Sequence, residues 1–226
     1  LSAHGACVLS LAPACVADVF DGMLRLAAAA GCDPSAAAAV VGRLRSRLRL
    51  ITAATASLPP PRPTVAVIAR PATPVACGGW VPELVRAAGG DPVPPLVGPG
   101  DAAAPLDWGD LRKAAPDVLI IVAPRRAGGR GGAPHSVAEL AVRAGWWALP
   151  AVRAGAVFVV DPALLTRPGP ALVDGAAALA AALRPGAGLP LPHPGALLKL
   201  SLAGGQRCRP GLLGEYFRLW PEPQGR

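Results

Sequence analysis

The chain has 226 residues, among them 28 prolines and 27 glycines, and its formal net charge is +8. Hydrophobic residues make up 52% of the chain and charged residues 16%. This balance excludes a disordered polyelectrolyte and provides enough apolar surface for a buried core. No uncharged apolar run reaches the roughly 18 residues that a membrane-spanning helix needs, so we do not expect the chain to span a membrane.

The positive charge does not by itself indicate a nucleic-acid-binding protein. Only Lys113 and Lys199 are lysines, so nearly all of the 22 cationic residues are arginines. The arginines are dispersed, and no helix-turn-helix or RNA-binding pattern surrounds them. A bias toward Ala, Arg, Gly and Pro is also typical of GC-rich coding sequence. We therefore expect no nucleic-acid partner.

The residue types that catalysis or metal binding would need are scattered along the chain. The 5 cysteines form no Cys-x-x-Cys pair and the 3 histidines lie far apart, which favours neither a disulfide framework nor a metal site. No serine stands in a Gly-x-Ser-x-Gly motif, and Asp107 and Asp110 are typical helix-start residues. Gly128–Gly132 lacks the Lys-Ser/Thr of a phosphate-binding loop and is interpreted as a flexible loop. The sequence therefore predicts no enzyme, no cofactor and no metal.

The first part of the chain predicts one strand and two helices. Residues 6–11 form a short apolar run and are interpreted as a buried strand. Apolar residues then recur at three- and four-residue spacing up to Gly31, which predicts an amphipathic helix. Asp33 followed by Pro34 is a favourable helix start, because the carboxylate can accept from backbone N–H groups and proline at the first position has no N–H to leave unpaired. This second helix is expected to run to about Ala56.

From residue 64 to residue 184 the pattern alternates between strands and helices. Strands are predicted at 64–69, 118–123 and 156–160, and helices at 80–88, 136–144 and 170–183, with a short helix after Asp107. The continuous apolar run at 118–123 is typical of a strand buried on both faces. This alternation predicts a parallel-rich α/β sandwich. The Pro- and Gly-rich tail from Pro185 stays unassigned.

Three segments of this α/β region together resemble a known family. They are Gly78-Gly79-Trp80-Val81-Pro82-Glu83-Leu84, Ala115-Pro116-Asp117-Val118-Leu119-Ile120-Ile121, and the stretch from Ala151 to Arg167-Pro168-Gly169-Pro170. Their order and spacing resemble the second lobe of the cobalamin and iron-siderophore class (class III) of periplasmic solute-binding proteins, the receptors of ABC importers. The Arg-Pro-Gly-Pro segment is most similar to the cobalamin-binding branch and its plant and algal relatives.

The resemblance implies a division of the chain into four parts. Residues 1–33 would be a remnant of the first lobe, residues 34–62 the interlobe helix with its Pro-rich boundary, residues 63–187 the second α/β lobe, and residues 188–226 a C-terminal extension. The expected fold class is thus α/β: a class III lobe, a parallel-rich αβα sandwich, with a long interlobe helix. Because most of the first lobe is missing, we expect the chain to be a fragment.

The resemblance also implies site residues. Trp80 matches an aromatic residue that faces the cleft, and Arg167 matches an arginine that meets polar groups of the ligand. Leu164 and Leu165 stand where an aromatic pair is common and are expected to contact the ligand. Glu83 lies near an acidic residue that docks onto the transporter. From the residues alone, Trp80 could instead cover the core, Arg167 could pair with a turn carbonyl, and Glu83 could be a solvated residue of a first helical turn.

The expected function is non-catalytic binding of a corrinoid such as cobalamin, or of an iron chelate, as the substrate-binding component of an ABC importer. The ligand and an ABC permease are the expected partners. The alternative is a scaffold or interaction protein that retains the fold without a ligand. The compartment is left open, because bacterial members of the class are exported, whereas a plant or algal member could be organellar or cytosolic.

Overall fold

The computed structural model describes residues 8–93, 101–124, 133–193, 195–202, 207–209, 213 and 215–220, with side chains left out at 133–135. The helices are α1 Val16–Ala29, α2 Pro34–Ala56, α3 Val81–Ala87, α4 Trp108–Ala114, α5 Ala133–Ala141, α6 Pro150–Arg153, α7 Pro162–Leu165 and α8 Ala171–Leu183, with 3-10 turns η2 Trp146–Ala148 and η3 Pro185–Ala187. The strands are β1 Thr64–Ala69, β2 Val75–Ala76, β3 Asp91–Pro92, β4 Ala104–Pro105, β5 Val118–Val122, β6 Val157–Val160, β7 Leu197–Leu200 and β8 Phe217–Trp220. Over these ranges, no helix combines the length and the apolar character needed to cross a bilayer.

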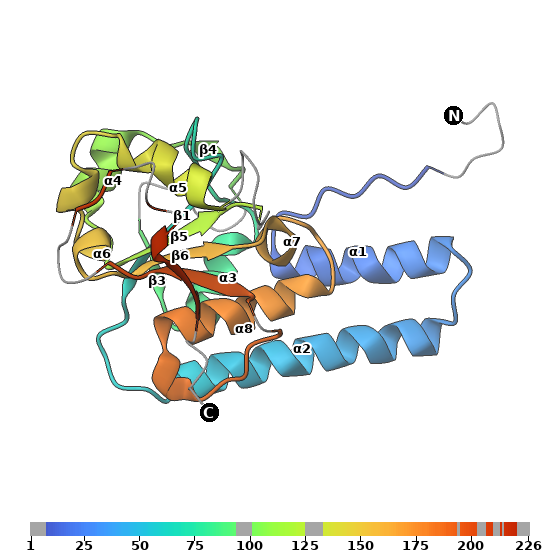
Figure 1. Cartoon of the computed structure of the whole chain (residues 1–226). Coiled ribbons are helices and arrows are strands. Elements are labelled where there is room, and N and C mark those ends of the chain that lie inside the picture. Colours follow the sequence, from blue (N-terminus) through green and yellow to red (C-terminus); the bar gives the residue numbers. More distant parts are fainter. Residues whose placement is uncertain are drawn as a thin grey trace.

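The centre of the fold is one mixed sheet in the order β4-β2-β1-β5-β6-β7-β8, with β3 pairing with β1 (Figure 1). Its middle strands β1, β5 and β6 are parallel, whereas β2, β4, β7 and β8 join the sheet in antiparallel pairs. Ala69 pairs with Val122, which in turn pairs with Val160. The three parallel strands therefore end together at one edge of the sheet.

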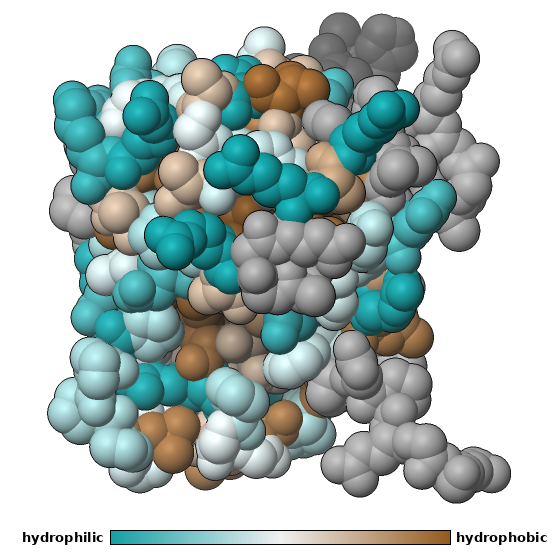
Figure 2. Space-filling model, turned by 60° about the vertical axis from the view of Figure 1, so that its left-hand side comes forward, coloured by the Kyte–Doolittle hydropathy of each residue, from teal (hydrophilic) through white to brown (hydrophobic). Residues whose placement is uncertain are grey.

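Helices cover both faces of the sheet, which makes the α/β sandwich that the sequence predicted. Side chains of β5 alternate between the two faces: Ile120 belongs to the hydrophobic cluster under α1, α2, α3 and α8, and Leu119 to the cluster under α4, α5 and α6. All five residues of β5 are buried, which confirms a strand covered on both sides. On the side of α4 and α6, hydrophobic residues lie scattered among hydrophilic ones at the surface drawn in colour in Figure 2.

Helices α1 and α2 form an antiparallel hairpin whose connected end projects beyond the sheet (Figure 1). The carboxylate of Asp33 accepts from the backbone N–H groups of Ser35 and Ala36, as expected for the start of α2. At its other end α2 packs on the body through buried Ile51 and Thr55. The predicted bounds of both helices are confirmed within one or two residues.

Two regions differ from the sequence prediction. The strand expected at 6–11 is wrong where the structure describes it, because residues 8–14 belong to no strand and Val8 is 61% exposed. An apolar run becomes a strand only beside a hydrogen-bonding neighbour, and no described strand lies alongside. In the tail, which the sequence left unassigned, β7 and β8 extend the sheet beyond β6. The glycine-rich segment Gly128–Gly132 lies outside the described residues.

Candidate functional site

A cavity of about 770 Å³ lies at the carboxyl ends of the parallel strands. Its wall includes the last residues of β1 and β5, Ala69 and Val122, and the first residue of α7, Pro162, two residues beyond the end of β6. In open α/β sheets, ligands bind outside the carboxyl ends of the strands, where the connecting segments leave a crevice. The remaining wall consists of Pro13, Arg70, Pro71, Val75, Cys77, Gly78, Gly79, Trp80, Val81, Ala102, Ala103, Pro105, Ala123, Pro124, Ser136 and Thr166.

Two glycines place the aromatic wall of this cavity. A Cβ at Gly78 would overlap the backbone of Asp101 and Ala102, so only glycine lets these two segments approach so closely. Gly79 has a φ of +61°, a conformation that residues with a side chain rarely adopt. The chain thereby turns directly into α3 and brings Trp80, the residue before its first turn, to the cavity.

Trp80 both lines the cavity and packs on the core. Its indole Nε1 donates a hydrogen bond to the carbonyl oxygen of Leu165 at 2.8 Å. The bond joins α3 to α7 and holds the ring in one orientation. A half-buried aromatic ring with a satisfied N–H presents a flat apolar surface to a ligand.

The other predicted ligand residues lie away from the described cavity wall. The side chains of Leu164 and Leu165 are buried in the core under α8, at 5% and 0% exposure. Arg167 is exposed, and it has no hydrogen bond or ion pair with another described residue. Its neighbour Thr166 does line the cavity.

Glu83 is neither fully solvated nor free. It lies in the first turn of α3, half-buried, and its Oε2 accepts a hydrogen bond from the backbone N–H of Val16 at 3.1 Å. Val16 is the first residue of α1, where backbone N–H groups lack partners within the helix. Glu83 therefore ties the start of α1 to the α/β body.

The structure adds two residues to the cavity that the sequence analysis did not select. Arg70 follows β1 directly and is exposed, and Cys77 is buried beside Gly78. Burial raises the pKa of the Cys77 thiol to about 12, so the thiol is neutral at pH 7 and is a poor nucleophile and metal ligand. The signal for Arg70 was present in the sequence, since a residue that directly follows a parallel strand stands at this edge of the sheet.

The cavity wall offers binding surface and little that supports a reaction. Arg70 is its one charged residue among those the structure describes, and Ser136 and Thr166 contribute hydroxyl groups. No cluster of three or more His, Cys, Asp or Glu residues able to hold a metal ion is found in the described part of the chain. The arrangement suits a partly apolar ligand held by one cation and a few polar groups.

Solved structures show the same fold. A periplasmic heme binding protein from Pseudomonas aeruginosa has a TM-score of 0.64 and 27% identity, over 81% of this chain and 66% of that one. A periplasmic binding protein from Veillonella parvula (TM-score 0.62, 23% identity) is covered over 57% of its length by 75% of this chain. The periplasmic vitamin B12 binding protein of Vibrio cholerae (TM-score 0.61, 16% identity) is covered over 67% by 81% of this chain. The chain thus spans 66% of the length of the heme binding protein and 57% of the length of the Veillonella parvula protein.

The sequence itself matches a family. No curated protein sequence matches this chain, but residues 1–164 match the sequence model of the periplasmic binding proteins. Proteins of this family bind solutes without catalysis, in agreement with the expectation that the chain is not an enzyme. With the mixed α/β sheet and the cavity at its carboxyl edge, the match shows that the chain belongs to the periplasmic binding protein family, in its class III form.

Proposed function

We propose that the chain binds a large metal chelate, a corrinoid or an iron chelate including haem, as the solute-binding component of an ABC importer. The cavity beside Trp80 carries this proposal, because its volume of about 770 Å³ lies within the roughly 300–1,000 Å³ typical of small-molecule pockets. The ligand's apolar surface would lie on the indole of Trp80. Arg167, next to the cavity residue Thr166, would reach polar groups of the ligand from the rim.

Two observations support different chelates as the ligand. The Arg167-Pro168-Gly169-Pro170 segment resembles the cobalamin-binding branch, whereas the heme binding protein from Pseudomonas aeruginosa is the more similar in sequence of the two ligand-named structures above, at 27% identity. Trp80 suits both ligands, because corrin and porphyrin each present a large flat ring.

We include Glu83 in the proposal as the residue that docks onto the permease. Its carboxylate is half-buried at the start of α3, and the hydrogen bond from Val16 fixes its orientation. In the same proposal α2 is the interlobe helix, residues 63–187 are the second lobe and residues 188–226 an extension. The Glu83→Gln variant would keep an acceptor for Val16 while removing the charge.

One observation favours the alternative, a scaffold that retains the fold without a ligand. Leu164 and Leu165 stand where the family commonly has an aromatic pair, and both are buried in the core instead of lining the cavity. A scaffold would keep the fold and lose ligand contacts of this kind.

Calorimetric titration with hemin, cyanocobalamin and ferrichrome separates the two candidates. We expect at least one of the three to bind, and Trp80→Ala to weaken that binding about tenfold or more, since buried tryptophans dominate binding energies. Trp80→Phe, which keeps the flat ring but loses the donor to Leu165, is expected to weaken it less. Trp147→Phe, on the other side of the sheet, is the matched control. Absence of binding by the folded chain at about 100 μM of every ligand would favour the scaffold.

A further inference from the structure

The described part of the cavity wall carries a positive charge with no negative charge beside it. Of the described residues in its wall, Arg70 alone is charged, and most of the others are Pro, Ala, Val or Gly. The guanidinium of Arg70 has no hydrogen bond or ion pair with another described residue, whereas Arg45 and Arg47 are paired with Asp21 and Asp174. A cation exposed to water needs no partner. Once a ligand excludes that water, the cation requires a negatively charged group in its place.

The backbone at Arg70 is suited to glycine, yet the sequence places an arginine there. Its φ is +49°, in the left-handed region that a residue with a Cβ enters only at a cost. Arg70 also precedes Pro71, and residues before proline favour extended conformations. The other described non-glycine residue with positive φ, Ala115, ends helix α4, where this conformation is common. No helix ends at Arg70, so an arginine occupies a position whose backbone conformation favours glycine. Strained positions of this kind cluster at ligand-binding sites.

The sheet places this arginine at the middle of the cavity edge. β1 lies between β2 and β5, and Ala69 pairs with both Val75 and Val122. Arg70 therefore follows β1 at the place where residues of both neighbouring strands, Val75 of β2 and Val122 of β5, also line the cavity. Because Trp80 belongs to the same wall, a bound molecule would meet a flat apolar ring and a guanidinium together.

We propose that the solute is an anionic chelate, and that Arg70 binds its carboxylate while the apolar body lies on Trp80. The inference rests on the proposed function and narrows its ligand class. It selects a tetrapyrrole or siderophore with carboxylate groups over a neutral ferric hydroxamate or neutral cobalamin. Guanidinium and carboxylate groups match as bidentate partners, which gives direction as well as affinity.

Hemin and its dimethyl ester test the inference directly, because they share the ring and iron and differ in the two carboxylates. By calorimetric titration, the wild-type chain is expected to bind hemin about tenfold more tightly than the ester. Arg70→Gln is expected to remove this preference, and Arg70→Lys to keep part of it. The preference of the wild type is also expected to weaken as salt is raised.

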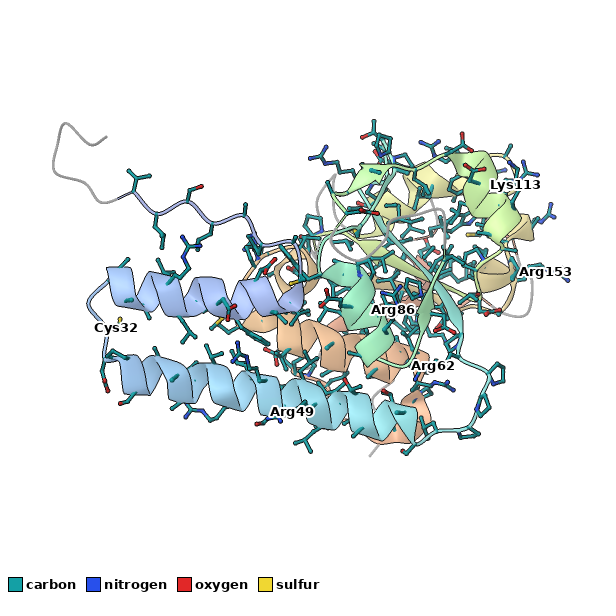
Figure 3. All side chains as sticks on the ribbon, turned by 180° about the vertical axis from the view of Figure 1, so that it is seen from behind. Cys32, Arg49, Arg62, Arg86, Lys113 and Arg153 are labelled. Carbon is teal, nitrogen blue, oxygen red and sulfur yellow. The ribbon has the colours of Figure 1, made fainter. Side chains whose placement is uncertain are left out.

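Arg62→Gln is the matched control. Arg62 is exposed and precedes β1 (Figure 3), whereas Arg70 follows it. The six residues of β1 separate the two positions by about 20 Å. The control removes the same charge from a chain of net charge +8, and it is expected to leave the preference for hemin unchanged.

The outcomes separate this inference from the proposed function. Equal affinity for hemin and ester, an unchanged preference in Arg70→Gln, or binding of cyanocobalamin or ferrichrome but not hemin would overturn the inference and leave the proposed function standing. Failure of every ligand to bind the folded wild-type chain would overturn both. A preference for hemin that Arg70→Gln removes and Arg62→Gln keeps would support both.

Discussion

Replacement of Gly175 by alanine is expected to destabilise the protein, whereas the same replacement at Gly42 is expected to stabilise it. Both glycines lie inside helices, α8 and α2, where alanine is favoured over glycine by about 1 kcal/mol. A Cβ at Gly42 would meet nothing within 4 Å. At Gly175 it would overlap the carbonyl oxygen of Leu164 and lie 2.9 Å from the carbonyl carbon, so α7 and α8 would have to move apart.

The magnitude follows from these two contributions. Overpacking against a backbone carbonyl is expected to cost about 3 kcal/mol, the upper end of the usual range, because a backbone segment must shift. After the gain in helix propensity, the net loss at Gly175 is about 2 kcal/mol, which lowers Tm by about 4–8 °C in a chain of this size. At Gly42 the full gain of up to about 1 kcal/mol remains.

Urea denaturation followed by far-UV circular dichroism measures both variants against the wild type. The two variants are expected to shift the urea midpoint in opposite directions with an unchanged m-value. If Gly175→Ala raised the midpoint as much as Gly42→Ala does, the close packing of α7 on α8 would be refuted. The packing of α7 on α8 would then no longer explain why the carbonyl oxygen of Leu165 lies within hydrogen-bond distance of Trp80.

Four further outcomes are expected. Thr55→Val should lower the free energy of unfolding by about 1–2 kcal/mol in urea titrations, since buried Thr55 donates to the carbonyl oxygen of Ala87 at 2.9 Å and joins α2 to α3; an unchanged midpoint would contradict this. Cys77 should react with iodoacetamide far more slowly than exposed Cys32 at pH 8, as read by mass spectrometry of the labelled peptides. Burial raises the pKa of Cys77 from 9.0 to about 12, so between these pH values the thiol ionises in the unfolded chain but not in the folded one. The free energy of unfolding should therefore fall by about 1.4 kcal/mol per pH unit from pH 9 to about pH 12. Cys77→Ala should lack this decline. Arg70→Gly should leave the midpoint unchanged or raise it while weakening hemin binding, and a lowered midpoint would indicate a structural role for the side chain.

The sequence predicted the elements that local chemistry determines. The start of α2 was readable because Asp33 and Pro34 act on their own helix, and β5 because five apolar residues in a row suit a strand covered on both faces. The run at 6–11 misled the same reasoning, because a strand also depends on a neighbour that the run itself does not describe. The short strand β7 was missed for the reverse reason, since pairing with β6 decides its conformation.

The candidate site was predictable only in part. Trp80 was predicted because the segment from Gly78 to Leu84 resembles the family, and Gly78 and Gly79 allow the turn that brings it to the cavity. Leu164 and Leu165 were expected at the ligand, but whether a leucine faces a cavity or the core depends on how a four-residue helix packs, which no local pattern records. The place of Arg70 directly after β1 was readable from the sequence, but its lack of a described carboxylate partner depends on how the cavity wall folds.

The projecting hairpin of α1 and α2 gives the molecule a lever arm. Helix α2 rests on the body near Ile51, and from there to Pro34 it extends about 26 Å. A tilt of about 10° at the body would displace the tip by about 4–5 Å, a change that is readily measured even where the displacement at the cavity is much smaller. Exposed Cys32 lies at that tip (Figure 3). A spectroscopic label attached there would magnify any reorientation of the hairpin and report it at a distance from the bound solute.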